Sequence, residues 1–105
     1  MILVVDDNEE IRHLLFATLN ARGYEVLTCC DGFEAIRLYE EHLSDLELVI
    51  MDVTMPMLSG IDAMGELRKI SQETPIVIMN GYFHDLDVPL IQRPFTQKQV
   101  LSLVS

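Results

Sequence analysis

Short runs of aliphatic residues alternate along this chain with longer stretches in which apolar residues recur at helical spacing. Five such runs are predicted as strands, at residues 2–5, 25–29, 46–51, 76–79 and, more briefly, 90–92. The first run is aliphatic throughout, which is typical of a strand that is covered on both faces. Strands that alternate with helices favour an α/β fold, in which a parallel sheet lies between layers of helices.

The helices are predicted from their caps and from their apolar stripes. Asn8 is suited to cap a helix whose first turn is acidic, and Gly23 is suited to stop it. Asp31 and the glycine after it lead into the next helical stretch. Helices are expected after Asn8, at residues 33–42, at residues 61–70 and after Thr96.

One interval is too short for the regular plan. Only eight residues separate Asn80 from Pro89, whereas a parallel crossover with its helix usually needs at least about 10 to 12. The fourth helix of the regular plan, which would connect the fourth and fifth strands, is therefore predicted to be a single turn or absent. The fifth strand could then be short, shifted or exchanged with a second molecule in a dimer.

Composition limits the kind of protein and its partners. The 105 residues, half of them apolar, fit one domain over 1–105. A formal net charge of −10 argues against direct binding to nucleic acid or to an anionic membrane surface. No signal peptide or membrane span is evident, so a cytoplasmic location is expected. Cys29 and Cys30 are adjacent, and both are expected to be reduced.

Acidic residues follow two of the predicted strands. Asp6 and Asp7 end the first strand, and Asp52 ends the third. In an open parallel sheet, ligands collect at the carboxyl ends of the strands, so neighbouring strands would bring these three carboxylates together. Such crowding of like charge is costly without a cation. Mg²⁺ is the expected occupant because it prefers hard oxygen ligands.

The order of these residues resembles a known family. The resemblance is carried by Ile2-Leu3-Val4-Val5-Asp6-Asp7, by Asp52-Val53-Thr54-Met55-Pro56-Met57-Leu58-Ser59-Gly60 and by Arg93-Pro94-Phe95. Together they are similar to the receiver domain of bacterial response regulators, which act in two-component signalling, over essentially the whole chain. The resemblance implies a three-layer, doubly wound, flavodoxin-like and CheY-like fold with a five-stranded sheet in the order 2-1-3-4-5.

The same resemblance implies a phosphoacceptor rather than a classical enzyme. Asp52 would take a phosphoryl group from a sensor histidine kinase or a histidine phosphotransfer domain. Asp7 and Asp52 would bind Mg²⁺ directly, Asp6 would act largely through bound water, and the backbone carbonyl of Thr54 would supply a further ligand. Output would pass to a downstream effector protein or domain.

Other positions match or depart from the family pattern. Asn80, Gly81 and Arg93 would contact the phosphoryl group. Asn80 stands where receivers usually carry Ser or Thr, and Arg93 stands where they carry Lys, which is not a conservative exchange. Leu90 stands where many receivers carry a switching aromatic residue. The residues expected to shape the site loops are Met55, Pro56, Gly60 and Pro94.

Three interpretations stay open from the sequence. The first is a phosphoacceptor with an atypical output surface, and the second is a degenerate receiver that acts as a protein-binding module. The third is an acidic-pocket hydrolase of another class. Against the hydrolase, Thr54 stands where aspartate-nucleophile phosphatases carry a second Asp, and no Gly-rich phosphate loop is present. The complete set of three acidic residues favours the first interpretation over the second.

Overall fold

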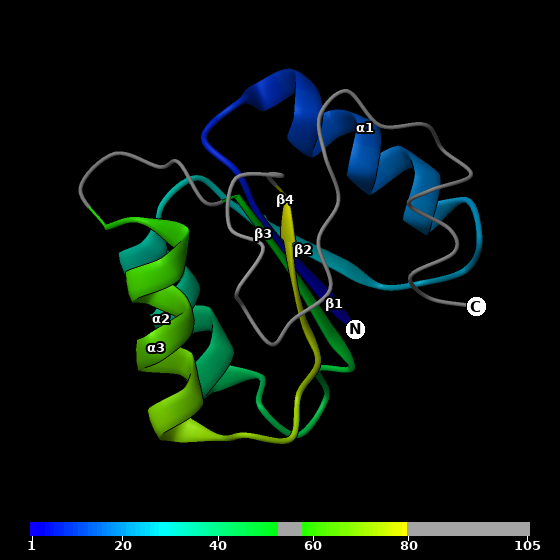
Figure 1. Cartoon of the computed structure of the whole chain (residues 1–105). Helices are drawn as coiled ribbons and strands as arrows, with labels where there is room; N and C mark the ends of the chain where they lie inside the picture. Colours follow the sequence, from blue (N-terminus) through cyan, green and yellow to red (C-terminus); the bar gives the residue numbers. More distant parts are fainter. Residues whose placement is uncertain (53–57, 80–105) are drawn as a thin grey trace.

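The computed structural model of the protein describes residues 1–52 and 58–79, which form a parallel sheet between two layers of helices (Figure 1). The strands are β1 (Ile2–Val5), β2 (Val26–Cys29), β3 (Leu48–Asp52) and β4 (Ile76–Met79). The helices are α1 (Glu9–Asn20), α2 (Gly32–Glu41) and α3 (Gly60–Ile70). None of the helices in these ranges is long and apolar enough to cross a bilayer.

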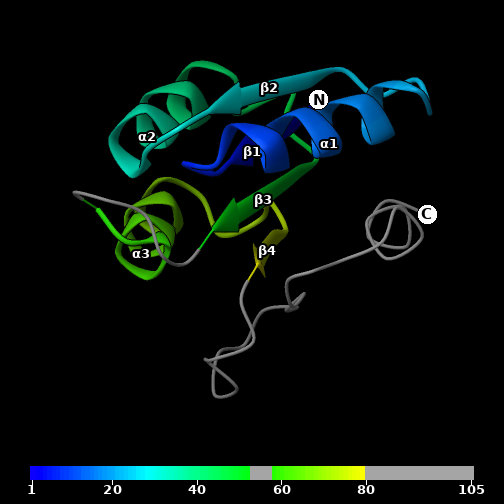
Figure 2. The same ribbon diagram turned by 90° about the horizontal axis from the view of Figure 1, so that it is seen from above.

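The sheet order is β2-β1-β3-β4, and every pair is parallel. This confirms the first four positions of the predicted order 2-1-3-4-5. The predicted fifth strand and the shortened fourth helix lie outside the described residues. Figure 2 shows α2 and α3 together on one face of the sheet and α1 on the other, as a doubly wound fold requires.

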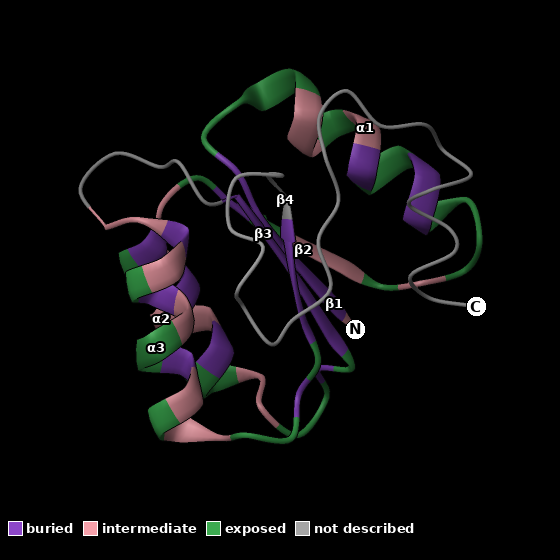
Figure 3. Ribbon diagram, viewed as in Figure 1, coloured by how far each residue is buried: buried purple, intermediate pink, exposed green. Residues whose placement is uncertain are grey.

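Alternate residues of each strand enter opposite layers of the core, because successive side chains point to opposite faces of a sheet. Leu3 and Val5 of β1 pack in the layer that contains Tyr39 of α2. Ile2 and Val4 pack in the layer that contains Leu15 of α1. β1 and β3 are therefore buried on both faces (Figure 3), which explains why they are nearly continuous aliphatic runs, whereas β2 at the edge of the sheet is buried only at Cys29.

β1 and β4 have the predicted bounds, and the boundaries of β2, β3, α2 and α3 differ from the prediction by one or two residues. The largest of these shifts is at β3, which begins at Leu48 rather than at residue 46. Leu46 is buried, but its N–H donates to the His42 carbonyl at 3.0 Å, so it belongs to the turn that ends α2. A hydrophobic side chain can thus fill the core from a turn as well as from a strand.

Gly23 adopts φ 87°, a conformation that L side chains rarely adopt. Its N–H donates to the Asn20 carbonyl at 3.0 Å, and this hydrogen bond closes the turn between α1 and β2. α1 itself ends at Asn20 with Ala21 as its C-cap, three residues before the predicted stop, and Gly23 lies at the end of the turn that follows.

Candidate functional site

The pairing of β1 with β3 brings the acidic residues to one edge of the sheet. Val5 lies opposite Met51, so the residues that follow, Asp6 and Asp52, lie level with each other. Asp6 and Asp52 are both 0% exposed, whereas Asp7 is exposed. Two carboxylates are thus enclosed by the fold, and the third, that of Asp7, lies on the solvent side of the site.

Asp6, Asp7 and Asp52, here called the acidic triad, bring their carboxylates into one cluster. One oxygen from each carboxylate lies within 4.8 Å of the others. The predicted convergence of these three side chains is therefore confirmed. Three hard oxygen donors at this spacing fit Mg²⁺, which keeps several waters and uses few carboxylates, and a divalent cation would offset their mutual repulsion.

The loop after β1 is held by hydrogen bonds to Asp6. The Asp6 N–H donates to the Cys29 carbonyl at 3.1 Å, and the Asn8 N–H donates to Asp6 Oδ1 at 2.8 Å. Asn8 Oδ1 in turn accepts from the N–H groups of Glu10 and Ile11 at 2.9 and 3.2 Å. The predicted cap of α1 is thus confirmed, and the loop that carries Asp7 continues directly into a fixed helix end.

Sequence reasoning missed Arg12. Its Nη1 donates to the backbone carbonyl of Asp6 at 2.7 Å, from within α1. A signal for it exists in the sequence, since Arg12 lies in the second turn of the helix that follows the loop and has the reach to turn back. The guanidinium has several N–H donors, which suits the backbone carbonyl of a residue just beyond the end of β1.

Most of the remaining predicted site residues lie outside the described part of the chain: Thr54, Met55, Pro56, Asn80, Gly81, Arg93 and Pro94. Gly60 is described, and it is the first residue of α3 and buried. Ser59 caps that helix, with its Oγ accepting from the Asp62 N–H at 3.2 Å. Gly60 therefore lies where the chain enters α3 after the site loop.

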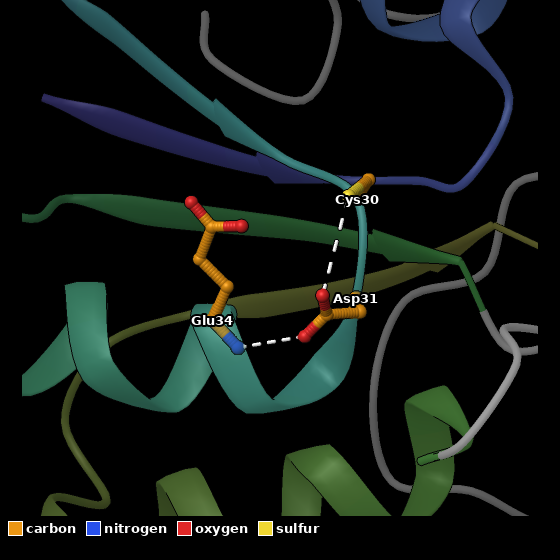
Figure 4. Close-up of side chains that lie close together, drawn as sticks. All are labelled: Cys30, Asp31 and Glu34. Carbon is orange, nitrogen blue, oxygen red and sulfur yellow. Dashed lines mark hydrogen bonds between the residues drawn. The ribbon is translucent and has the colours of Figure 1, made fainter.

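A second cluster of possible metal ligands was not predicted. Cys30, Asp31 and Glu34, here called the α2 cap cluster, place one ligand atom each within 4.8 Å of the others (Figure 4). Asp31 Oδ1 accepts from the Glu34 N–H at 2.8 Å and so caps α2. Cys30 is exposed, and its Sγ lies 4.0 Å from Asp31 Oδ2. The cap explains the position of Asp31 without any ligand.

The neighbouring thiol of Cys29 has an unusual environment. Both cysteines are free, and Cys29 is buried at 5% exposure. Burial raises the pKa of Cys29 from 9.0 to about 12, and the negative charges of Glu34 and Asp31 add to the rise. This thiol is therefore protonated at neutral pH and unsuited to nucleophilic chemistry.

Comparisons with known proteins agree with the geometry. The sequence model of the response regulator receiver domain matches residues 2–89. The chain is 38% identical over 86 residues to the probable transcriptional regulator ycf27 of Cyanidium caldarium, covering 82% of this chain and 33% of that protein. The transcriptional regulators among the curated relatives are longer, and the chain spans about a third to a half of their length.

Solved structures show the same fold. The receiver domain of the hybrid histidine kinase CckA is 33% identical with a TM-score of 0.88, covering 98% of this chain and 94% of that one. The CheX–CheY–BeF3–Mg complex of Borrelia burgdorferi superposes with a TM-score of 0.91 over 98% of this chain and 84% of that chain. That chain is 23% identical and supports the fold alone.

Proposed function

The chain belongs to the response regulator receiver domain family of two-component signalling, and on that premise we propose that Asp52 accepts a phosphoryl group in a magnesium-dependent reaction. The observation that carries the proposal is the acidic triad. Its carboxylate oxygens lie within 4.8 Å of one another, and two of the three residues are fully buried at the carboxyl edge of the sheet. We further propose that residues 1–105 form one such domain.

Asp52 is the proposed nucleophile. An oxygen of its carboxylate attacks the phosphorus in line, while the bond from phosphorus to the donor's leaving atom breaks. For a phosphohistidine donor, the leaving atom is an imidazole nitrogen, which takes up a proton to become neutral histidine. The position of Asp52 at the end of β3 supports this role because the strand holds its carboxylate, which is buried, beside those of Asp6 and Asp7.

The remaining roles follow from the same proposal. Asp7 and Asp52 bind Mg²⁺ directly together with the Thr54 carbonyl, and Asp6 holds it largely through water. When bound, the ion neutralises charge on the transferring group. Asn80, Gly81 and Arg93 contact the phosphoryl oxygens. The loops that carry them are shaped by Met55, Pro56, Gly60 and Pro94.

The proposed phosphoryl donor is a sensor histidine kinase or a histidine phosphotransfer domain, and the proposed recipient of the signal is an effector protein or domain. The support is the family assignment together with the similarity to CckA, a hybrid histidine kinase by name, and to proteins named as transcriptional regulators. The proposal also keeps the three alternatives for the fifth strand, which is short, shifted or exchanged with a second molecule, and only the last of these gives a dimer.

The test is direct phosphorylation of the full chain. Incubation with Mg²⁺ and acetyl phosphate should add one phosphoryl group, detected by intact mass, and removal of Mg²⁺ with EDTA should prevent the gain. Asp52→Ala should abolish it. Asp31→Ala, which removes a carboxylate from the α2 cap cluster, is the matched control and should leave the gain intact. A gain that persists in Asp52→Ala would contradict the proposal.

A second function is favoured by one observation in the sequence. Asn80, Arg93 and Leu90 replace the hydroxyl, the amine and the aromatic residue that receivers use for switching. These exchanges support a degenerate receiver that binds a protein partner without phosphorylation. Under that alternative, the wild-type chain would bind Mg²⁺ but gain no phosphoryl group, and beryllofluoride would leave its amide spectrum unchanged.

A further inference from the structure

The carbonyl of Asp6 marks the point where β1 leaves the sheet. The last paired residues of β1 and β2 are Val5 and Cys29, and Asp6 comes directly after them. Asp6 is 0% exposed, and a buried carbonyl needs a donor. Arg12 supplies it, with Nη1 2.7 Å from the carbonyl oxygen.

The contact fixes a peptide plane and not only a single atom. The Asp6 carbonyl belongs to the planar peptide that joins Asp6 to Asp7, so holding its oxygen sets the direction in which Asp7 leaves the strand. The Asp6 N–H is held by the Cys29 carbonyl at 3.1 Å, and Asp6 Oδ1 accepts from the Asn8 N–H at 2.8 Å. Arg12 completes the set by holding the third polar group of Asp6.

We propose that Arg12 is a positioning residue for the acidic triad. Through the Asp6 carbonyl, its guanidinium fixes the Asp6–Asp7 peptide so that both carboxylates face Asp52 in the arrangement that binds Mg²⁺. This inference rests on the proposed function, which it deepens by adding a residue that touches neither the ion nor the phosphoryl group. Groups that orient metal ligands in this way typically change affinity by 10–100-fold.

Charge alone predicts the opposite result, which makes the inference testable. Arg12 is a cation beside an anionic site, so its removal should strengthen Mg²⁺ binding if only Coulomb energy matters. Its removal should weaken binding if the hydrogen bond orients the ligands. The sign of the change therefore separates the two effects.

A purely structural role is also separable. Arg12 is half-buried and lines a hollow of about 320 Å³ together with Glu9, His13, Phe16 and Thr28. Removal of the guanidinium leaves space in which water can donate to the Asp6 carbonyl instead, but water cannot fix the peptide plane from α1. We therefore expect a small loss of stability and a larger loss of metal affinity.

The experiment compares Arg12→Met with Arg22→Met in the full chain. Arg22 is exposed beyond the end of α1, about 15 Å along the helix from Arg12, and its removal changes the net charge equally. Calorimetric titration with Mg²⁺ should show about tenfold weaker binding for Arg12→Met and a change of less than about twofold for Arg22→Met. Arg12→Lys, which keeps the charge and one donor, should fall between wild type and Arg12→Met.

A metal-free measurement accompanies the titration. In EDTA, hydrogen exchange of the Asn8 amide should be about tenfold faster in Arg12→Met than in Arg22→Met, because the loop opens more often. Tighter or unchanged Mg²⁺ binding in Arg12→Met, with unchanged exchange at Asn8, would overturn the inference even if wild type is phosphorylated. A wild type without any Mg²⁺ affinity would instead overturn the proposed function, and the exchange rates would still decide the role of Arg12.

Discussion

The acidic triad and the α2 cap cluster lie at the same edge of the sheet, yet they are built differently. Cys30 follows β2 directly, as Asp6 follows β1, and each cluster gathers three ligand atoms within 4.8 Å. The triad joins residues from strands far apart in the sequence, and two of its members are fully buried. The three residues of the α2 cap cluster lie within five consecutive positions of the chain, and its cysteine is exposed.

The difference lies in what each carboxylate does for the fold. Asp31 caps α2, so the helix end accounts for its position. Asp52 is the last residue of a buried strand, and it caps none of the helices in the part of the chain that the structure describes. Burying a carboxylate beside two others costs stability unless a cation or hydrogen bonds compensate its charge. Close acidic side chains therefore indicate a metal site only when local structure does not already explain them.

The largest expected effect is on magnesium binding. Asp52→Asn keeps the shape of the side chain and removes a proposed direct ligand, so we expect Mg²⁺ affinity to fall by at least about 100-fold. Asp31→Asn makes the same chemical change in the α2 cap cluster and should alter affinity by less than about twofold. Calorimetric titration at pH 7 measures both. Equal losses in the two variants would mean that the ion binds elsewhere along this edge.

The next effect concerns Cys29 at high pH. The folded protein keeps the Cys29 proton up to a pKa of about 12, whereas the unfolded chain releases it near 9.0. The contribution of the buried thiol to the free energy of unfolding is therefore complete below pH 9. It is lost as the pH rises toward 12, at about 1.4 kcal/mol per pH unit. We expect a loss of about 2 kcal/mol between pH 9 and pH 10.5.

Urea unfolding at several pH values measures this slope. Cys29→Ala should flatten it relative to wild type, and the difference between the two curves cancels the other groups that titrate in this range. Cys30→Ser, at the exposed neighbour in the α2 cap cluster, is the control and should keep most of the slope. If Cys29→Ala and wild type lose stability in parallel, the burial of this thiol does not govern the high-pH limit.

A smaller effect of opposite sign is expected for the metal-free protein. Asp52→Asn removes one of three crowded negative charges, so the free energy of unfolding in EDTA should rise by about 1–2 kcal/mol. Added Mg²⁺ should stabilise wild type and leave this variant unchanged. Asp31→Asn should not gain stability in EDTA, and Mg²⁺ should stabilise it as it stabilises wild type. A variant less stable than wild type in EDTA would show that the fold itself compensates the charge of Asp52.

The architecture was predictable because its signals are local. Aliphatic runs marked the four described strands to within two residues, and Asn8 and Asp31 marked the starts of α1 and α2. The start of β3 was misplaced because Leu46 is buried from a turn, and composition alone does not distinguish a buried turn residue from a strand residue. Such boundaries depend on backbone hydrogen bonds that form only in the folded chain.

The site was predictable only where topology sufficed. Parallel strands end at one edge, so the meeting of Asp6 and Asp52 followed from the order of the elements. The contact from Arg12 to the Asp6 carbonyl depends on the rotamer of a long side chain, which spacing does not determine. The roles of Thr54, Asn80 and Arg93 stay predictions from the family pattern.

The smallest expected effect tests the explanation of the α2 cap cluster. Asp31→Ala removes the acceptor for the Glu34 N–H and should lower the free energy of unfolding by about 1 kcal/mol. Asp31→Asn keeps an acceptor oxygen and should change stability by a few tenths of a kcal/mol at most. Urea denaturation in EDTA and again in Mg²⁺ should give the same difference between the two variants.

That equality is the deciding result. A cap is a hydrogen bond to a helix end, so its value does not depend on a divalent ion, whereas a ligand would stabilise the folded chain only when the ion is present. If the two variants differ more in Mg²⁺ than in EDTA, Asp31 contributes to ion binding. The contrast between the two clusters would then be one of affinity and not of kind.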